Sequence, residues 1–189
     1  MLLLQQLVQC PQSVNLVLNF KQEKAISSQS IVRILVVDDF APWRDCVLEK
    51  LRENPSLHVI GVAADGFEAV LKTEELQPDL ILLDISLPKL NGIVVARRIR
   101  KVAPESKILF LSQEHDPDVA QAALSAGGHG YVVKSNAHCE LFAAVEAVML
   151  GKKFVSRRMA DDAVYMSKHK IEEAEERRDL TLLLTLSYA

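Results

Sequence analysis

Short apolar runs alternate along this chain with longer segments in which apolar residues recur at helical spacing. The expected strands are residues 31–39, 57–63, 78–84, 107–111 and 130–133, and the expected helices are residues 42–53, 67–76, 93–102, 118–125 and 138–150. Strands and helices in regular alternation favour a parallel sheet with helices on both faces. The pattern therefore predicts a doubly wound α/β fold with a five-stranded parallel sheet.

Four of the predicted strands end in a polar side chain that can take part in chemistry. Asp38 and Asp39 end the first strand, Asp84 ends the third, Ser112 follows the fourth and Lys134 follows the fifth. The carboxyl ends of parallel strands lie at one edge of a sheet, and ligands bind along that edge. We expect three carboxylates, one hydroxyl and one ammonium group to converge there.

The three carboxylates would repel one another at a dry sheet edge. A hard divalent cation would offset this repulsion, and Mg2+ prefers oxygen ligands such as carboxylates, waters and phosphates. Asp38, Asp39 and Asp84 are therefore candidate magnesium ligands. An alternative for Asp38 and Asp39 is that they cap the helix that follows, as Asp often does.

The remaining groups at this edge suit phosphoryl chemistry. The carboxylate of Asp84 could attack phosphorus and form an acyl phosphate. Lys134 could pair with a phosphate, and the hydroxyl of Ser112 could donate a hydrogen bond to it. Asp84, Lys134 and Ser112 are thus the candidate catalytic residues.

Several short motifs resemble those of two-component response-regulator receiver domains. They are Val37-Asp38-Asp39, Leu83-Asp84-Ile85-Ser86-Leu87-Pro88 followed by Asn91-Gly92, Leu111-Ser112, and Gly130-Tyr131-Val132-Val133-Lys134. Gly127 and the exit Gly151-Lys152-Lys153-Phe154-Val155-Ser156 resemble the NarL/FixJ branch, whose output is usually a LuxR-type DNA-binding domain. The resemblance implies a flavodoxin-like, CheY-like receiver fold.

The resemblance also implies a role for each residue of the acidic edge. Asp84 would accept a phosphoryl group from a histidine kinase, and Lys134 would contact that group. Asp39 would bind Mg2+ directly, Asp38 would act through water, and the backbone carbonyl of Ser86 would be a further ligand.

Two residues would form a conformational switch in such a domain. Ser112 would move toward the phosphoryl group while Tyr131 turns inward, and a local charge change would bias the two states. For Tyr131 the alternative is a half-buried strand aromatic. The family often has proline after the lysine, whereas Ser135 stands here, which leaves the backbone geometry after Lys134 open.

The chain divides into three parts by composition. Residues 1–30 have a linker composition, which predicts a disordered extension. The receiver motifs place the receiver domain at residues 31–151. The composition of residues 152–189 predicts a charged helical tail. Leu180-Thr181 resembles the start of a LuxR-type domain, but Leu182-Leu183-Leu184 follow. We interpret the tail as a remnant of a linker or output domain in a truncated regulator; a single-domain receiver with a coiled-coil tail is the alternative.

Charge and cysteine content narrow the location and the partners. The net charge is −3 and the charges of the tail are mixed, so no direct DNA binding is expected from this chain. The first residues lack a basic region and are interrupted by glutamine, which argues against an export signal, and no membrane span is expected. Three widely spaced cysteines fit a cytoplasmic protein.

We expect a regulator rather than an enzyme. Phosphorylation would control its output, and the expected output is transcription. One alternative is a phosphatase of the haloacid-dehalogenase type, although such enzymes carry an Asp-x-Asp pattern on the first strand and this chain has Asp38-Asp39-Phe40. Another is a stand-alone receiver that acts through protein–protein contacts. The helices at 118–125 and 138–150 flank the last predicted strand, and this face is a candidate homodimer surface.

Overall fold

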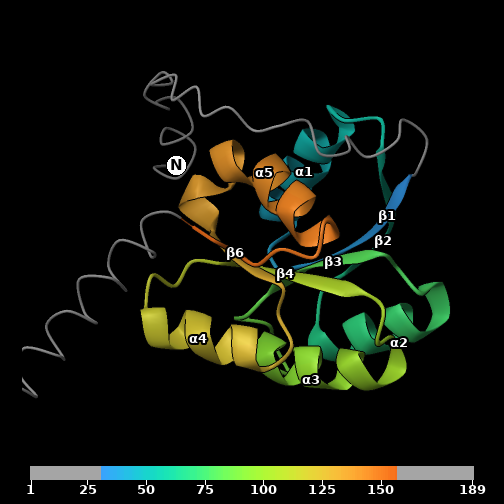
Figure 1. Ribbon diagram of the computed structural model, residues 1–189. Helices are drawn as coiled ribbons and strands as arrows, with labels where there is room; N and C mark the ends of the chain where they lie inside the picture. The colour runs from blue at the N-terminus through green and yellow to red at the C-terminus, as the bar shows by residue number, and fades with distance from the viewer. Residues whose placement is uncertain (1–30, 157–189) are drawn as a thin grey trace, which may run out of the picture.

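The structure, a computed structural model, describes residues 31–156 (Figure 1). The strands are β1 (Val32–Val37), β2 (Leu57–Ala63), β3 (Leu80–Asp84), β4 (Lys107–Ser112), β5 (Gly130–Val133) and β6 (Phe154–Val155). The helices are α1 (Ala41–Arg52), α2 (Gly66–Leu76), α3 (Gly92–Val102), α4 (Pro117–Ser125) and α5 (Ala137–Met149), with a short 3-10 helix η2 (Lys134–Asn136) between β5 and α5.

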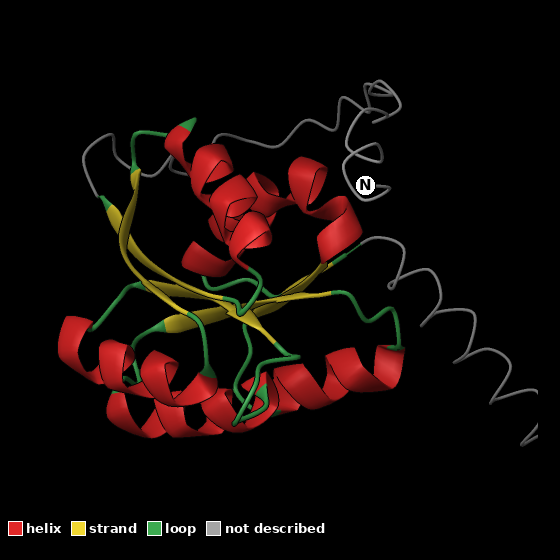
Figure 2. Cartoon of the chain, turned by 180° about the vertical axis from the view of Figure 1, so that it is seen from behind, coloured by secondary structure: helices red, strands yellow, loops and turns green. Residues whose placement is uncertain are grey.

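All neighbouring strands are parallel, in the order β2-β1-β3-β4-β5-β6. Helices α1 and α5 cover one face of the sheet, and α2, α3 and α4 cover the other (Figures 1 and 2). The order reverses between β1 and β3, because the chain moves first to one side of β1 and then to the other. Ligands of doubly wound sheets bind at such a reversal, beyond the carboxyl ends of the strands.

The core lies on both faces of the sheet. All residues of β3 and β5 are buried, which explains why these strands appear in the sequence as continuous apolar runs. Leu83 and Phe110 pack in a cluster with residues of α2, α3 and α4, whereas Leu82 and Leu109 pack in a second cluster with residues of α1 and α5. The predicted α/β fold is therefore confirmed.

The five predicted strands are all present, and the structure adds a sixth, short strand at the edge of the sheet. The sixth strand, β6, has two residues and pairs with β5 through Gly130 with Phe154 and Tyr131 with Val155. Two residues are too few to produce a recognisable alternation in the sequence. The short helix η2, which begins at Lys134 and leads directly into α5, was also not predicted. Every peptide bond in residues 31–156 is trans, including the one before Ser135.

The helices begin and end close to the predicted positions. Helix α1 starts at Ala41, one residue before the expected start, and α4 starts at Pro117 instead of residue 118. The predictions for residues 1–30 and for the tail beyond residue 156 lie outside the described residues. Within residues 31–156, no helix has the length and apolar character needed to cross a bilayer.

Candidate functional site

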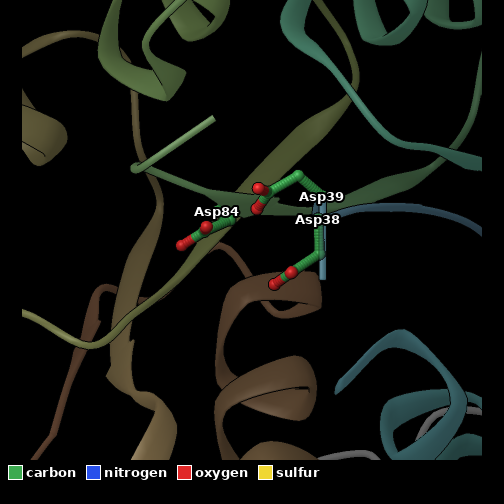
Figure 3. Close-up of side chains that lie close together, drawn as sticks. All are labelled: Asp38, Asp39 and Asp84. Atoms are coloured by element: carbon green, nitrogen blue, oxygen red, sulfur yellow. The ribbon is translucent and has the colours of Figure 1, made fainter. Parts of the chain in front are cut away.

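Three carboxylates meet at the carboxyl edge of the sheet, as predicted. Asp38 and Asp39 directly follow β1, and Asp84 is the last residue of the neighbouring strand β3. Each contributes a carboxylate oxygen to a group in which all these atoms lie within 4.8 Å of one another (Figure 3). Residues separated by 45 positions in the chain are thus brought together by the pairing of two adjacent strands.

Asp38 is nearly fully buried and uses both of its carboxylate oxygens. Oδ1 accepts a hydrogen bond from the backbone N–H of Phe40 at 3.0 Å, and Oδ2 lies 2.6 Å from Nζ of Lys134. The residue that caps α1 is Phe40, and no side chain makes a capping bond there. Asp38 therefore shapes the turn before α1, and the alternative that Asp38 and Asp39 cap this helix is not supported.

Lys134 places its ammonium group between two of the carboxylates. The side chain follows β5 and is only 9% exposed, and Nζ lies 2.6 Å from Asp38 Oδ2 and 3.2 Å from Asp84 Oδ1. The same ammonium lies 5.6 Å from the ring centroid of Trp43 in α1, within the range of a cation–π contact. Trp43 was not predicted as a neighbour of the site, because nothing in its sequence context distinguishes it from a core aromatic.

One ammonium against three carboxylates leaves an excess of negative charge at this edge. Burial raises the pKa of Asp84, and the nearby positive charge of Lys134 opposes that rise while the negative charge of Asp38 adds to it. Asp39 is exposed to solvent on the outer side of the group. Two buried carboxylates and an exposed one, all of them oxygen ligands, suit a hard divalent cation that keeps part of its water shell.

The loop after β3 passes close to Asp84 and explains why glycine stands at position 92. A Cβ atom on Gly92 would lie 2.1 Å from the backbone oxygen of Asp84, so no side chain fits there. The N–H of Gly92 donates to the carbonyl of Ile85, and Asn91 caps α3 by accepting from Ile93 N. Ser86 lies in this loop and is exposed; its predicted role as a metal ligand stays a prediction.

Ser112 and Tyr131 are both fully buried and are linked through one loop residue, Glu114. The Ser112 hydroxyl accepts from the N–H of Glu114 at 3.1 Å, and the Tyr131 hydroxyl donates to the carbonyl of Glu114 at 3.0 Å. Burial raises the pKa of Tyr131. The Tyr131 side chain is thus fully buried, so the alternative of a half-buried strand aromatic is wrong, and its role in a switch stays a prediction. Glu114 was missed because it contributes backbone atoms, which carry no sequence signal.

A sequence model of one protein family, described as the response regulator receiver domain, matches residues 34–146. Among curated proteins, the response regulator GacA of Pseudomonas protegens is 29% identical over 137 residues, which cover 72% of this chain and 64% of that protein. A protein-glutamate methylesterase/protein-glutamine glutaminase of Maricaulis maris is 38% identical over 116 residues, which cover 60% of this chain but only 29% of that enzyme.

The fold has matches among solved structures as well. The crystal structure of a LuxR-family two-component response regulator from Aurantimonas sp. SI85-9A1 aligns with a TM-score of 0.70 and 32% identity, covering 73% of this chain and 99% of that chain. These matches agree with the receiver motifs and with the predicted LuxR-type branch, and they do not support the haloacid-dehalogenase alternative.

Proposed function

Because the chain belongs to the response regulator receiver domain family, we propose that it accepts a phosphoryl group on Asp84 and transmits that change to an output. The observation that supports Asp84 best is its position: it is a buried carboxylate that is itself the last residue of the central strand β3, stands beside Lys134 and shares a cluster with two further carboxylates. Asp39 is more exposed, and Asp38 already makes a hydrogen bond and a close ion pair.

The proposed step is a displacement at phosphorus. A carboxylate oxygen of Asp84 attacks the phosphorus of a phosphohistidine, the new O–P bond forms as the P–N bond breaks, and the imidazole keeps the electron pair of that bond. Lys134 can then exchange its contact with the Asp84 oxygen for one with a phosphoryl oxygen. Ser112 is one strand away and offers a hydroxyl, which makes it the candidate for sensing the new group.

The donor set at the sheet edge fits Mg2+, with Asp38, Asp39, Asp84 and the carbonyl of Ser86 as the residues that would hold it. Bound there, the cation would offset the negative charge of the transferring group. The rest of the step depends on groups of the chain: Asp84 as the nucleophile and Lys134 as the fixed positive charge.

The remaining assignments follow from the family. We assign the receiver to residues 31–151 together with β6 (Phe154–Val155), which pairs with β5, and we assign linker-like segments to the residues before and after it. A cytoplasmic histidine kinase is the proposed phosphodonor. Control of transcription is the proposed output, because a similar structure is that of a LuxR-family regulator.

The face formed by α4, β5 and α5 is a candidate surface for a homodimer. The chain itself would be a regulator rather than an enzyme with a metabolic substrate.

The test is to incubate the full chain with Mg2+ and acetyl phosphate and to measure the intact mass. We expect a gain of one phosphoryl group in the natural chain and none in Asp84→Asn. Asp79→Asn is a matched control, because Asp79 lies just before the other end of the same strand, where Oδ2 accepts from the N–H of Arg33. Equal labelling of Asp84→Asn and the natural chain would exclude Asp84 as the acceptor.

A further inference from the structure

The buried side chain of Ser156 bonds the backbone next to Lys134. Ser156 follows β6 and is fully buried. Its N–H donates to the carbonyl of Tyr131 at 2.9 Å, which continues the pairing between β6 and β5. Its hydroxyl oxygen accepts from the N–H of Val133 at 3.0 Å. The side chain thus supplies an acceptor to β5 at the point where β6 has already ended.

The hydroxyl also has a charged acceptor on its other side. Because the N–H of Val133 can only donate, the hydrogen of the Ser156 hydroxyl is free to be donated to the second partner, Oε2 of Glu140. Glu140 lies in the first turn of α5, where a carboxylate is favoured by the helix dipole. A hydrogen bond to an ionised acceptor is stronger than one between neutral groups. The two hydrogen bonds that run from the Val133 N–H through the Ser156 hydroxyl to Glu140, called the relay below, therefore hold Val133 firmly.

We propose that Ser156 is a positioning residue for Lys134, an inference that rests on the function proposed above. Val133 is paired with Ser112 of β4 on one side and bonded to Ser156 on the other. Fixing Val133 on both sides fixes the start of the Lys134 side chain and thereby keeps its ammonium between Asp38 and Asp84. Without Ser156, the N–H of Val133 would lose its partner at this edge and the backbone would shift to find another.

Ser156 also connects the phosphoryl site to the chain that follows. Residue 156 is where the chain leaves the last strand of the sheet, and its backbone and side chain both bond β5. A change in the position of Lys134 on phosphorylation would therefore act on Ser156 through Val133. By linkage, tension on the segment after Ser156 would act in the reverse direction on the site.

The test compares Ser156→Ala, Ser156→Thr and Ser106→Ala in the full chain. Ser106 is also buried, and its hydroxyl donates to the carbonyl of Pro78, but it lies just before β4, at the opposite edge of the sheet. The rate of labelling by acetyl phosphate with Mg2+ should fall about three- to tenfold in Ser156→Ala, as expected for the loss of one well-formed hydrogen bond. Ser156→Thr keeps the hydroxyl and should restore most of the rate, and Ser106→Ala should keep the natural rate.

A second measurement is independent of phosphorylation. The ¹⁵N resonance of the Lys134 ammonium and the hydrogen exchange of the Val133 amide should both change in Ser156→Ala and stay unchanged in Ser106→Ala. If the natural chain is not labelled at all, the proposed function fails, and these two signals still decide whether Ser156 positions Lys134. Natural labelling together with an unchanged Lys134 resonance in a folded Ser156→Ala chain would overturn the inference.

Glu140→Gln provides the test if Ser156→Ala does not fold. This variant keeps the size of the side chain and removes the charge that strengthens the relay. We expect a change of the same direction and smaller size in both the labelling rate and the Lys134 resonance. No change in either signal would also overturn the inference.

Discussion

The two edges of the sheet both carry polar side chains, but these side chains are satisfied in different ways. At the amino edge, the hydroxyl of Ser106 donates to the carbonyl of Pro78, and Nδ1 of His129 accepts from the N–H of Ile108. At the carboxyl edge, the ammonium of Lys134 has two carboxylates as partners instead of backbone atoms. The two amino-edge side chains bond neutral backbone groups, whereas at the carboxyl edge an ammonium lies against two carboxylates.

This difference shows at which of the two sheet edges chemistry can occur. At the amino edge, each of these two polar groups already has a neutral backbone partner. The carboxyl edge has three carboxylates for one ammonium, and one of those carboxylates is exposed. An unmatched cluster of this kind stays responsive to a cation or a phosphoryl group. Charge, rather than burial alone, therefore separates the two edges.

The largest expected effect is the loss of the buried ammonium. Lys134→Met should lower the free energy of unfolding at neutral pH by about 3 kcal/mol, because removing one partner leaves buried carboxylates uncompensated. The measurement is urea unfolding without divalent cations and again with Mg2+, which should recover part of the loss. Labelling by acetyl phosphate should also be weakened, while magnesium still binds.

Lys89→Met is the matched control for this substitution. Lys89 also lies 2.6 Å from an aspartate oxygen, that of Asp65, but its side chain is 63% exposed. Solvent screens such a pair, so the change in stability should be far smaller than for Lys134→Met. Equal losses in the two variants would mean that distance alone, and not burial, determines the strength of these pairs.

The strand ends could be predicted from the sequence because the pattern of the buried strands is explicit. Four apolar runs that each end in a polar residue are enough to bring Asp38, Asp84, Ser112 and Lys134 to one edge once the strands are parallel. The sequence could not predict which ion-pair and hydrogen-bond partners each side chain has within that edge. Lys134 was expected to meet a phosphate, and the distances show that it holds two carboxylates together.

The features that escaped prediction depend on backbone atoms or on very short elements. The carbonyl and N–H of Glu114 join Ser112 to Tyr131, and any residue type except proline could supply them. Strand β6 is defined by two residues that pair with β5, too few for a periodic signal. Gly92 was noted as part of a motif, but its reason, the close approach to the Asp84 carbonyl, is a three-dimensional fact.

An intermediate effect is expected at the amino edge as the pH is lowered. Burial, followed by the charges of Lys107, Arg100 and Lys153, lowers the pKa of His129 from 6.5 to about 4. The unfolded chain therefore binds more protons than the folded chain between these values. The stability that the neutral His129 contributes is complete above pH 6.5 and is lost as the pH falls toward 4. The loss is about 2 kcal/mol in total, less than the full pKa difference would give, because the ring is partly exposed to solvent.

His129→Asn isolates this contribution, because an Asn oxygen can accept from Ile108 N without titrating. Urea unfolding of both chains at several pH values should show a steeper fall for the natural chain between pH 6.5 and 4. Parallel curves would mean that His129 is protonated without cost in the fold, and that the amino edge is more open to water than its contacts indicate.

The smallest effects should differ in sign between the two edges. Ser106→Ala removes a satisfied group and should lower the free energy of unfolding by about 1 kcal/mol. Asp84→Asn should raise it, because burial raises the pKa of Asp84 and the ionised carboxylate is therefore unfavourable in the folded chain. The gain should be absent below pH 3.8, where Asp84 is protonated in both states, should grow as the pH rises from 3.8 to the folded-state pKa, and should stay constant above it. Thermal unfolding across this range measures both variants, and a loss of stability in Asp84→Asn at neutral pH would mean that Lys134 compensates the carboxylate fully.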